Sequence, residues 1–209
     1  MAAAHAGLGI EFDVRPAAGG EPIIFHDAIL DRMTGETGLV ESYSASELTA
    51  MPLNGGGRLI TLDALLDAWP AKTPLLCEMK IDGATDPVVF ARAVGDRLLD
   101  YQGPVAAMSF NPVAVRALPD GLMRGQLVDA ARRIGERAFS AAMAAITPAH
   151  ADYIACHTSD AEQARQRADE LSMPVITWTV KDVSTSHWLK DIVDAQIFEG
   201  FDPALIKPH

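Results

Sequence analysis

Short apolar runs rich in β-branched residues recur along this chain, and segments with helical periodicity separate them. A strand followed by a helix, repeated many times, is typical of a parallel sheet with helices packed on it. The alternation therefore predicts an α/β fold. The expected strands cover residues 10–14, 22–25, 75–79, 105–110, 123–128, 152–156, 174–180 and 195–198.

The segments between these runs have the periodicity and the start signals of helices. Thr61, Asn111 before Pro112, and Asp160 before Glu162 are good helix caps. Each connection has the length of a right-handed crossover between parallel strands. The expected helices cover residues 61–69, 86–99, 111–118, 130–145, 160–171 and 183–192.

Seven or so parallel strands can close into a barrel or form an open doubly wound sheet, and periodicity alone does not separate the two. No Gly-x-Gly-x-x-Gly follows the first strand, which disfavours an open dinucleotide-binding sheet. A hydrophobic share of 49% supplies a core, and 209 residues suit one barrel domain over residues 1–209. We therefore favour a TIM-type (β/α) barrel.

The segment after residue 26 interrupts the alternation. It contains the turn residues Gly35 and Gly38 and the run Asn54-Gly55-Gly56-Gly57, with one short helix expected at residues 46–51. We interpret residues 27–58 as an insertion at the barrel mouth.

The charge and the apolar pattern limit the partners. A formal net charge of -11 disfavours binding of nucleic acid or of an anionic membrane through a broad basic surface. No segment has 18 uninterrupted apolar residues, and Met1–Gly9 lacks the features of a signal peptide, so we expect no membrane insertion and a cytoplasmic location unless the true start lies upstream. Cys77 and Cys156 lie in separate apolar runs, which indicates two buried free thiols.

Acidic residues mark the ends of two expected strands. Glu11 and Asp13 alternate with apolar residues, so both side chains lie on one face at the carboxyl end of residues 10–14. Glu78 and Lys80 share one face at the end of the strand at 75–79. The carboxyl ends of barrel strands are where the active sites of such barrels lie.

Three carboxylates that point the same way repel one another unless a cation lies between them, and an all-oxygen site suits Mg²⁺ or Ca²⁺. The alternative is that Glu11 and Asp13 face solvent and that Glu78 simply pairs with Lys80. The coincidence of both patterns favours a site for one divalent cation at Glu11, Asp13 and Glu78. Lys80 could then neutralise a phosphate oxygen.

His26 follows the strand at 22–25 and begins the interruption. A histidine there can exchange protons near neutral pH, as general acid–base catalysis requires. A single histidine at a strand end is more often structural, and its spacing alone does not decide between the two.

An ordered set of motifs resembles the glycerophosphodiester phosphodiesterase family from about Gly9 to Pro203. The pieces are Gly9-Ile10-Glu11-Phe12-Asp13-Val14-Arg15, Phe25-His26-Asp27, Leu30-Asp31-Arg32-Met33-Thr34-Gly35, Thr61-Leu62-Asp63, Glu78-Met79-Lys80, Ser109-Phe110 and Trp178-Thr179-Val180. Each piece is weak alone, and the ordered set is specific.

The resemblance implies a barrel with an insertion after its second strand and metal-dependent hydrolysis of a soluble glycerophosphodiester to glycerol 3-phosphate and an alcohol, a reaction of glycerophospholipid metabolism. It implies that Glu11, Asp13 and Glu78 hold the metal, that His26 is one of two acid–base histidines, and that Lys80 contacts phosphate. It also implies that Phe110 and Trp178 line the substrate mouth; core packing is the alternative for these aromatics.

The chain departs from the family at its start. The family opens with a strand ending in His-Arg-Gly and a helix that begins near Glu-Asn, and this sequence has neither, so it resembles a barrel without its first strand and most of its first helix. Met1–Gly7 resembles the tail of that helix, with Gly7 as its stop. Either the recorded start is late, which the retained motifs favour, or the chain is a truncated, inactive phosphodiester-binding relative. A phospholipase D-like or phosphoinositide-cleaving relative is a third hypothesis.

Overall fold

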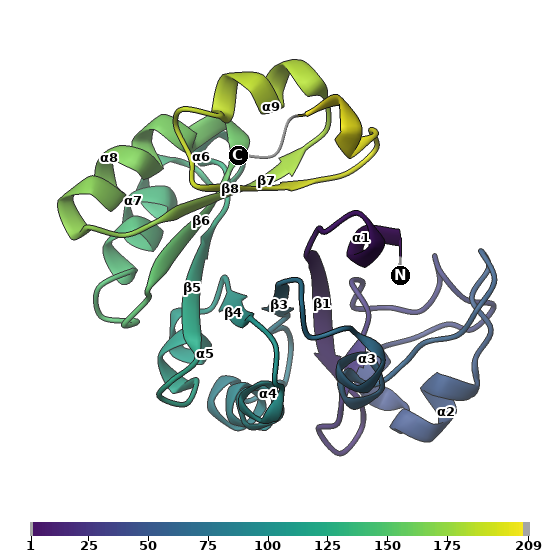
Figure 1. The fold of residues 1–209 in the computed structure, drawn as a ribbon. Helices are drawn as coiled ribbons and strands as arrows, with labels where there is room; N and C mark the ends of the chain where they lie inside the picture. The colour runs from purple at the N-terminus through teal and green to yellow at the C-terminus, as the bar shows by residue number, and fades with distance from the viewer. Residues whose placement is uncertain (1, 207–209) are drawn as a thin grey trace. The chain divides into compact units, whose positions relative to one another are not determined.

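The computed structural model describes residues 2–206, which divide into two compact units. The first unit ends at Met123 and the second begins at Arg124. Parallel strands alternate with helices in both units, so the predicted α/β fold is confirmed (Figure 1). Each unit is described separately.

The first unit contains a sheet with the strand order β2-β1-β3-β4. The strands β1, β3 and β4 run parallel, and helices α3, α4 and α5 connect or follow them. Its elements are α1 (Ala2–His5), β1 (Ile10–Pro16), β2 (Pro22–Ile24), η1 (Val40–Ser42), α2 (Ala45–Ala50), α3 (Leu62–Ala68), β3 (Leu75–Met79), α4 (Pro87–Asp100), β4 (Val105–Ser109) and α5 (Pro112–Ala117).

Strand β2 corrects one expectation, because it pairs with β1 in the antiparallel direction. Only residues 17–21 connect the two strands, which is far too short for a crossover between parallel strands. The two strands therefore form a hairpin. Val14 pairs with Ile24 in that hairpin, and Val14 also pairs with Met79 of β3 on its other side.

Local capping fixes the helices of this unit. Ser44 and Glu47 form a reciprocal capping box at the start of α2. The Asp86 carboxylate accepts from two backbone N–H groups at the start of α4, where Pro87 occupies the first turn. At the chain start, Gly7 adopts a φ of +73° two residues after the end of α1, as predicted for a helix stop; Met1 lies outside the described residues.

Apolar side chains form two clusters in the first unit. Helix α4 buries Phe90, Val94 and Leu98 from one face into the cluster that also contains residues of β1 and β3. Burial of each such side chain contributes about 1.5–3 kcal/mol relative to exposure. The second cluster belongs to the segment around residues 27–58 and its neighbours, and it contains Ala17, Ile23, Phe25, Leu30, Val40, Leu48 and Leu59.

The second unit repeats the alternation in the order β5-β6-β7-β8, with all pairs parallel. Gly135, at a φ of +83°, divides the segment expected as one helix over 130–145 into two, because that backbone conformation cannot continue a right-handed helix. The elements are β5 (Met123–Val128, starting at the boundary), α6 (Ala131–Ile134), α7 (Glu136–Ala145), β6 (Tyr153–His157), η2 (Thr158–Asp160), α8 (Ala161–Leu171), β7 (Val175–Val180), α9 (Val183–Leu189), β8 (Ala195–Phe198) and η3 (Pro203–Leu205).

Within residues 2–206, no helix has both the length and the apolarity needed to cross a membrane.

Candidate active site

Strand register places two carboxylates opposite each other in the first unit. Asp13 of β1 is the direct cross-strand partner of Glu78 of β3. Like charges in such positions destabilise a sheet unless a cation separates them. Glu11, two residues before Asp13, lies on the same face of β1.

Glu11, Asp13 and Glu78 each offer an oxygen, and the three oxygens lie within 4.8 Å of one another. Of the residues that the structure describes, these alone form such a group of three potential metal ligands. The donor set is entirely oxygen, which fits Mg²⁺ or Ca²⁺. Glu78 Oε1 is buried and makes no hydrogen bond among the described residues besides its ion pair with Lys80, so it retains lone pairs for a cation.

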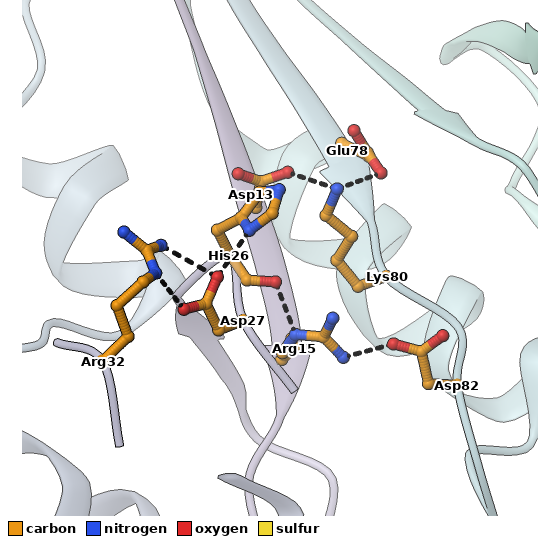
Figure 2. A network of polar contacts seen from close by, with 8 residues as sticks. All are labelled: Asp13, Arg15, His26, Asp27, Arg32, Glu78, Lys80 and Asp82. Atoms are coloured by element: carbon orange, nitrogen blue, oxygen red, sulfur yellow. Dashed lines mark hydrogen bonds and ion pairs between the residues drawn. The ribbon is translucent and has the colours of Figure 1, made fainter. Parts of the chain in front are cut away.

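Lys80 lies between two of these carboxylates. Its Nζ is 3.0 Å from Asp13 Oδ1 and 2.5 Å from Glu78 Oε1 (Figure 2). Its side chain is only 15% exposed, and the two carboxylates are similarly enclosed. Lys80 therefore provides the positive charge that keeps the acidic pair together in this structure.

Burial and charge act in opposite directions on these groups. Burial raises the pKa of Glu78, although the Lys80 ammonium opposes the shift. Burial also disfavours the charged form of Lys80, but the carboxylates of Glu78 and Asp13 outweigh it and raise the Lys80 pKa above its usual value. Lys80 thus stays protonated, and burial favours the neutral form of Glu78.

The β1–β2 hairpin brings His26 to this group. Phe25 N donates to Asp13 O at 3.0 Å, which places the next residue, His26, beside the carboxylates. His26 Nδ1 lies 2.8 Å from Asp27 Oδ1, and Arg32 binds both oxygens of Asp27 at 2.6 and 2.9 Å. The Arg32 hydrogen bond is the main reason that the pKa of Asp27 is held far below its usual range.

This arrangement orients the imidazole. Because Asp27 is ionised, a neutral His26 donates from Nδ1 and keeps its lone pair on Nε2. Figure 2 shows that outer nitrogen on the side of Asp13 and Lys80. Asp27 and Arg32 were not predicted as site residues, although both lie in the motifs that carry the family resemblance.

A cavity of about 260 Å³ opens beside these residues, within the first unit. Phe110, 41% exposed, lies on its wall, and its predicted contact with substrate stays a prediction. The wall also contains Arg15, which sequence reasoning left without a role. The cavity is lined by Arg15, His26, Glu78, Met79, Lys80, Ile81, Asp82, Ser109, Phe110 and Asn111.

Trp178 belongs to the second unit, on β7. Its indole Nε1 donates to Ala155 O at 3.2 Å, and its ring meets His157 edge to face at a centroid distance of 5.4 Å. It is partly exposed, so the ring is not simply a core residue. Its predicted contact with substrate stays a prediction.

The parallel strands and the acidic group where β1 and β3 end define an α/β protein of the TIM-barrel type. Solved structures support this class. A phosphodiesterase from Oleispira antarctica, solved with the product sn-glycerol-3-phosphate, is 22% identical, with a TM-score of 0.77 over 94% of this chain and 83% of that one.

Two further solved structures have a similar fold. A glycerophosphodiester phosphodiesterase from Parabacteroides distasonis is 18% identical, with a TM-score of 0.73 over 94% of this chain and 82% of its own. The enzyme from Thermotoga maritima is 18% identical, with a TM-score of 0.68 over 90% and 80% of the two chains. A comparison with curated proteins gives no match.

The model of the glycerophosphoryl diester phosphodiesterase family matches residues 1–198. The chain therefore belongs to that family, and the resemblance read from the sequence motifs is confirmed.

Proposed function

We propose that this protein hydrolyses glycerophosphodiesters to glycerol 3-phosphate and an alcohol, and that the cavity of the first unit is the site. The observation that carries the proposal is the convergence of Glu11, Asp13, Glu78, Lys80 and His26 at the ends of β1, β2 and β3. Family membership and the product bound in the Oleispira antarctica relative support the substrate class.

The three carboxylates would hold one divalent cation, Mg²⁺ or Ca²⁺. When bound, the cation supplies Lewis-acid polarisation of a phosphoryl oxygen. The clustered oxygens and the free lone pairs of buried Glu78 fit such an ion. The Lys80 ammonium would then also interact with the negatively charged phosphate, since it lies beside Asp13 and Glu78 and stays protonated.

His26 would act as the general base. Its Nε2 lone pair accepts a proton from the attacking water molecule as the oxygen of that water forms the new O–P bond. Asp27 stabilises the resulting imidazolium through Nδ1, at the 2.8 Å contact already present. The bond from phosphorus to the alcohol oxygen breaks, and that oxygen takes a proton, which the imidazolium can return. Phe110 and Trp178 would contact the glycerol or alcohol portion.

Activity assays on single substitutions test this assignment. Glu11→Gln should abolish metal-dependent release of glycerol 3-phosphate, and His26→Ala should lower turnover by about 10²- to 10⁴-fold while metal binding persists. Glu162→Gln and His187→Ala change exposed residues of the same types on α8 and α9, and both should keep full activity. Full activity in Glu11→Gln would rule out the metal role.

The alternative is a protein that binds a phosphodiester without hydrolysing it. Among the described residues that line the cavity, His26 is the single histidine, whereas the family uses a pair. Saturable binding of glycerophosphocholine without product, under conditions where metal is bound, would establish this alternative.

A further inference from the structure

We propose that Arg15 is a second phosphate-binding cation of this cavity, alongside Lys80. This inference rests on the proposed function for the identity of the anion, a phosphodiester or its phosphate product. Arg15 is buried, with a relative exposure of 8%, and it lies on the cavity wall. A charged group is costly to bury unless it is paired, and the one carboxylate that pairs with Arg15 among the described residues is the largely exposed Asp82.

Strand geometry directs Arg15 to the site. Residues 11, 13 and 15 alternate on β1, so Arg15 shares a face with Glu11 and Asp13. The strand continues past Val14 because the hairpin pairs Arg15 with Ile23. The same backbone that carries the acidic group thus carries a cation one step further along.

The guanidinium has unused donors. Its Nε donates to His26 O at 2.8 Å, and its Nη1 donates to Asp82 Oδ2 at 2.7 Å. An arginine has five N–H donors, and within residues 2–206 no other partner of Arg15 is present. In Figure 2 the remaining amino group carries no contact and lies on the Lys80 side.

Asp82 is a partner that an incoming anion can replace. Its side chain is 58% exposed, and it binds Arg15 through one oxygen only. Because the Asp82 carboxylate faces solvent, water screens its side of the pair and lowers the free energy that the pair contributes. A phosphate offers the fork of the guanidinium two oxygens at once, which is the geometry that arginine favours. The cavity of about 260 Å³ has room for a phosphate group between Arg15 and Lys80.

Calorimetric titration of the full chain with sn-glycerol 3-phosphate, and separately with inorganic phosphate, tests the assignment in the presence of Mg²⁺ or Ca²⁺. Arg15→Gln should weaken both affinities about 10- to 100-fold, the loss expected for charge-assisted hydrogen bonds. Arg15→Lys keeps the positive charge and loses the two-pronged guanidinium, so its affinity for each ligand should lie between that of the parent and that of Arg15→Gln. Asp82→Asn removes the competing carboxylate and should not weaken binding.

Arg97→Gln is the matched control, because Arg97 pairs with Asp63 in the same unit and does not line the cavity. It should bind as the parent does. Thermal unfolding of each variant shows whether it is folded. If Arg15→Gln does not fold, the comparison is made with Arg15→Lys. Unchanged affinity in a folded Arg15 variant, or no binding by the parent at millimolar ligand, would overturn the inference.

Hydrolysis of glycerophosphocholine, measured on the same proteins, separates this inference from the proposed function. If the parent binds the ligands in an Arg15-dependent way but releases no product, the phosphate site stands and the proposed hydrolysis is wrong. If Arg15→Gln hydrolyses the substrate in a metal-dependent way with the KM and product affinity of the parent, the proposed function stands and the role of Arg15 is wrong.

Discussion

Replacement of Lys80 by methionine tests how the acidic group is held together. The ammonium lies 3.0 Å from Asp13 and 2.5 Å from Glu78, with all three side chains at most 16% exposed. Two unit charges 4.8 Å apart repel by about 3.5 kcal/mol at an effective dielectric constant near 20. Without Lys80 that repulsion is no longer offset, so Lys80→Met should lower the free energy of unfolding by about 3–5 kcal/mol in chelator.

For a chain of this length such a loss lowers Tm by about 6–20 °C. A divalent cation should reverse much of the loss, because it takes over the neutralisation of Glu11, Asp13 and Glu78. At a concentration 100 times its Kd, a bound ion adds about 2.7 kcal/mol. Since the ion shares its carboxylates with Lys80 in the parent, the rise in Tm on adding Ca²⁺ or Mg²⁺ should be larger in Lys80→Met.

The assay is thermal and urea unfolding of parent and variant, with chelator and with each metal. Lys72→Met is the matched control, because Lys72 is exposed in the loop before β3, and its Tm should match that of the parent. Equal stability of Lys80→Met and the parent in chelator would refute the account of the ion pair. Equal metal-induced shifts would refute competition between Lys80 and the cation.

Three further predictions concern other parts of the structure. Asp27→Asn removes a carboxylate whose pKa is lowered mainly by Arg32. The parent should therefore have the higher Tm above the unfolded-state pKa of about 3.9, and the difference in Tm should shrink as pH falls below that value. A difference in Tm that stays constant with pH would contradict the ion pair. Burial raises the pKa of Cys77 and raises that of Cys156 to about 12. A thiol reagent at pH 8 should therefore leave both cysteines unmodified in the folded protein and modify both in denaturant. Rapid reaction of the native protein would contradict their burial. Asp86→Ala removes two cap hydrogen bonds of α4 and should cost about 0.5–2 kcal/mol in urea unfolding, and no loss would show that the cap is dispensable.

Local patterns in the sequence predict much of the fold. Alternating apolar and acidic residues place Glu11 and Asp13 on one face, and the structure brings them together with Glu78. The β5 and β8 strands begin and end where their apolar runs predict. The strand bounds and the direction of each side chain depend on residues close in sequence, whose spacing fixes which face a side chain occupies.

Other features depend on chain direction and on contacts between distant residues. The strand at Pro22–Ile24 was correctly located, but the short connection from β1, which makes it antiparallel, was overlooked. The continuous helix over 130–145 was wrong because Gly135 adopts a positive φ, which composition alone does not specify.

Arg15 could have been found from the sequence, since the alternation that selects Glu11 and Asp13 extends to it. Its pairing with Asp82, 67 residues away, could not, because that contact arises only when the loop after β3 lies beside the β1–β2 hairpin. Arg32 and Asp27 lie close in sequence, but their role in orienting His26 follows from the fold of the intervening loop.

The most direct test of the proposed function is release of glycerol 3-phosphate from glycerophosphocholine by the purified chain of 209 residues, after treatment with chelator and after addition of Mg²⁺ or Ca²⁺. The account predicts no release in chelator, restored release with at least one of the two metals, and no restoration in Glu78→Gln. Release that persists in chelator, or a folded, metal-bound protein that releases no product, would contradict it.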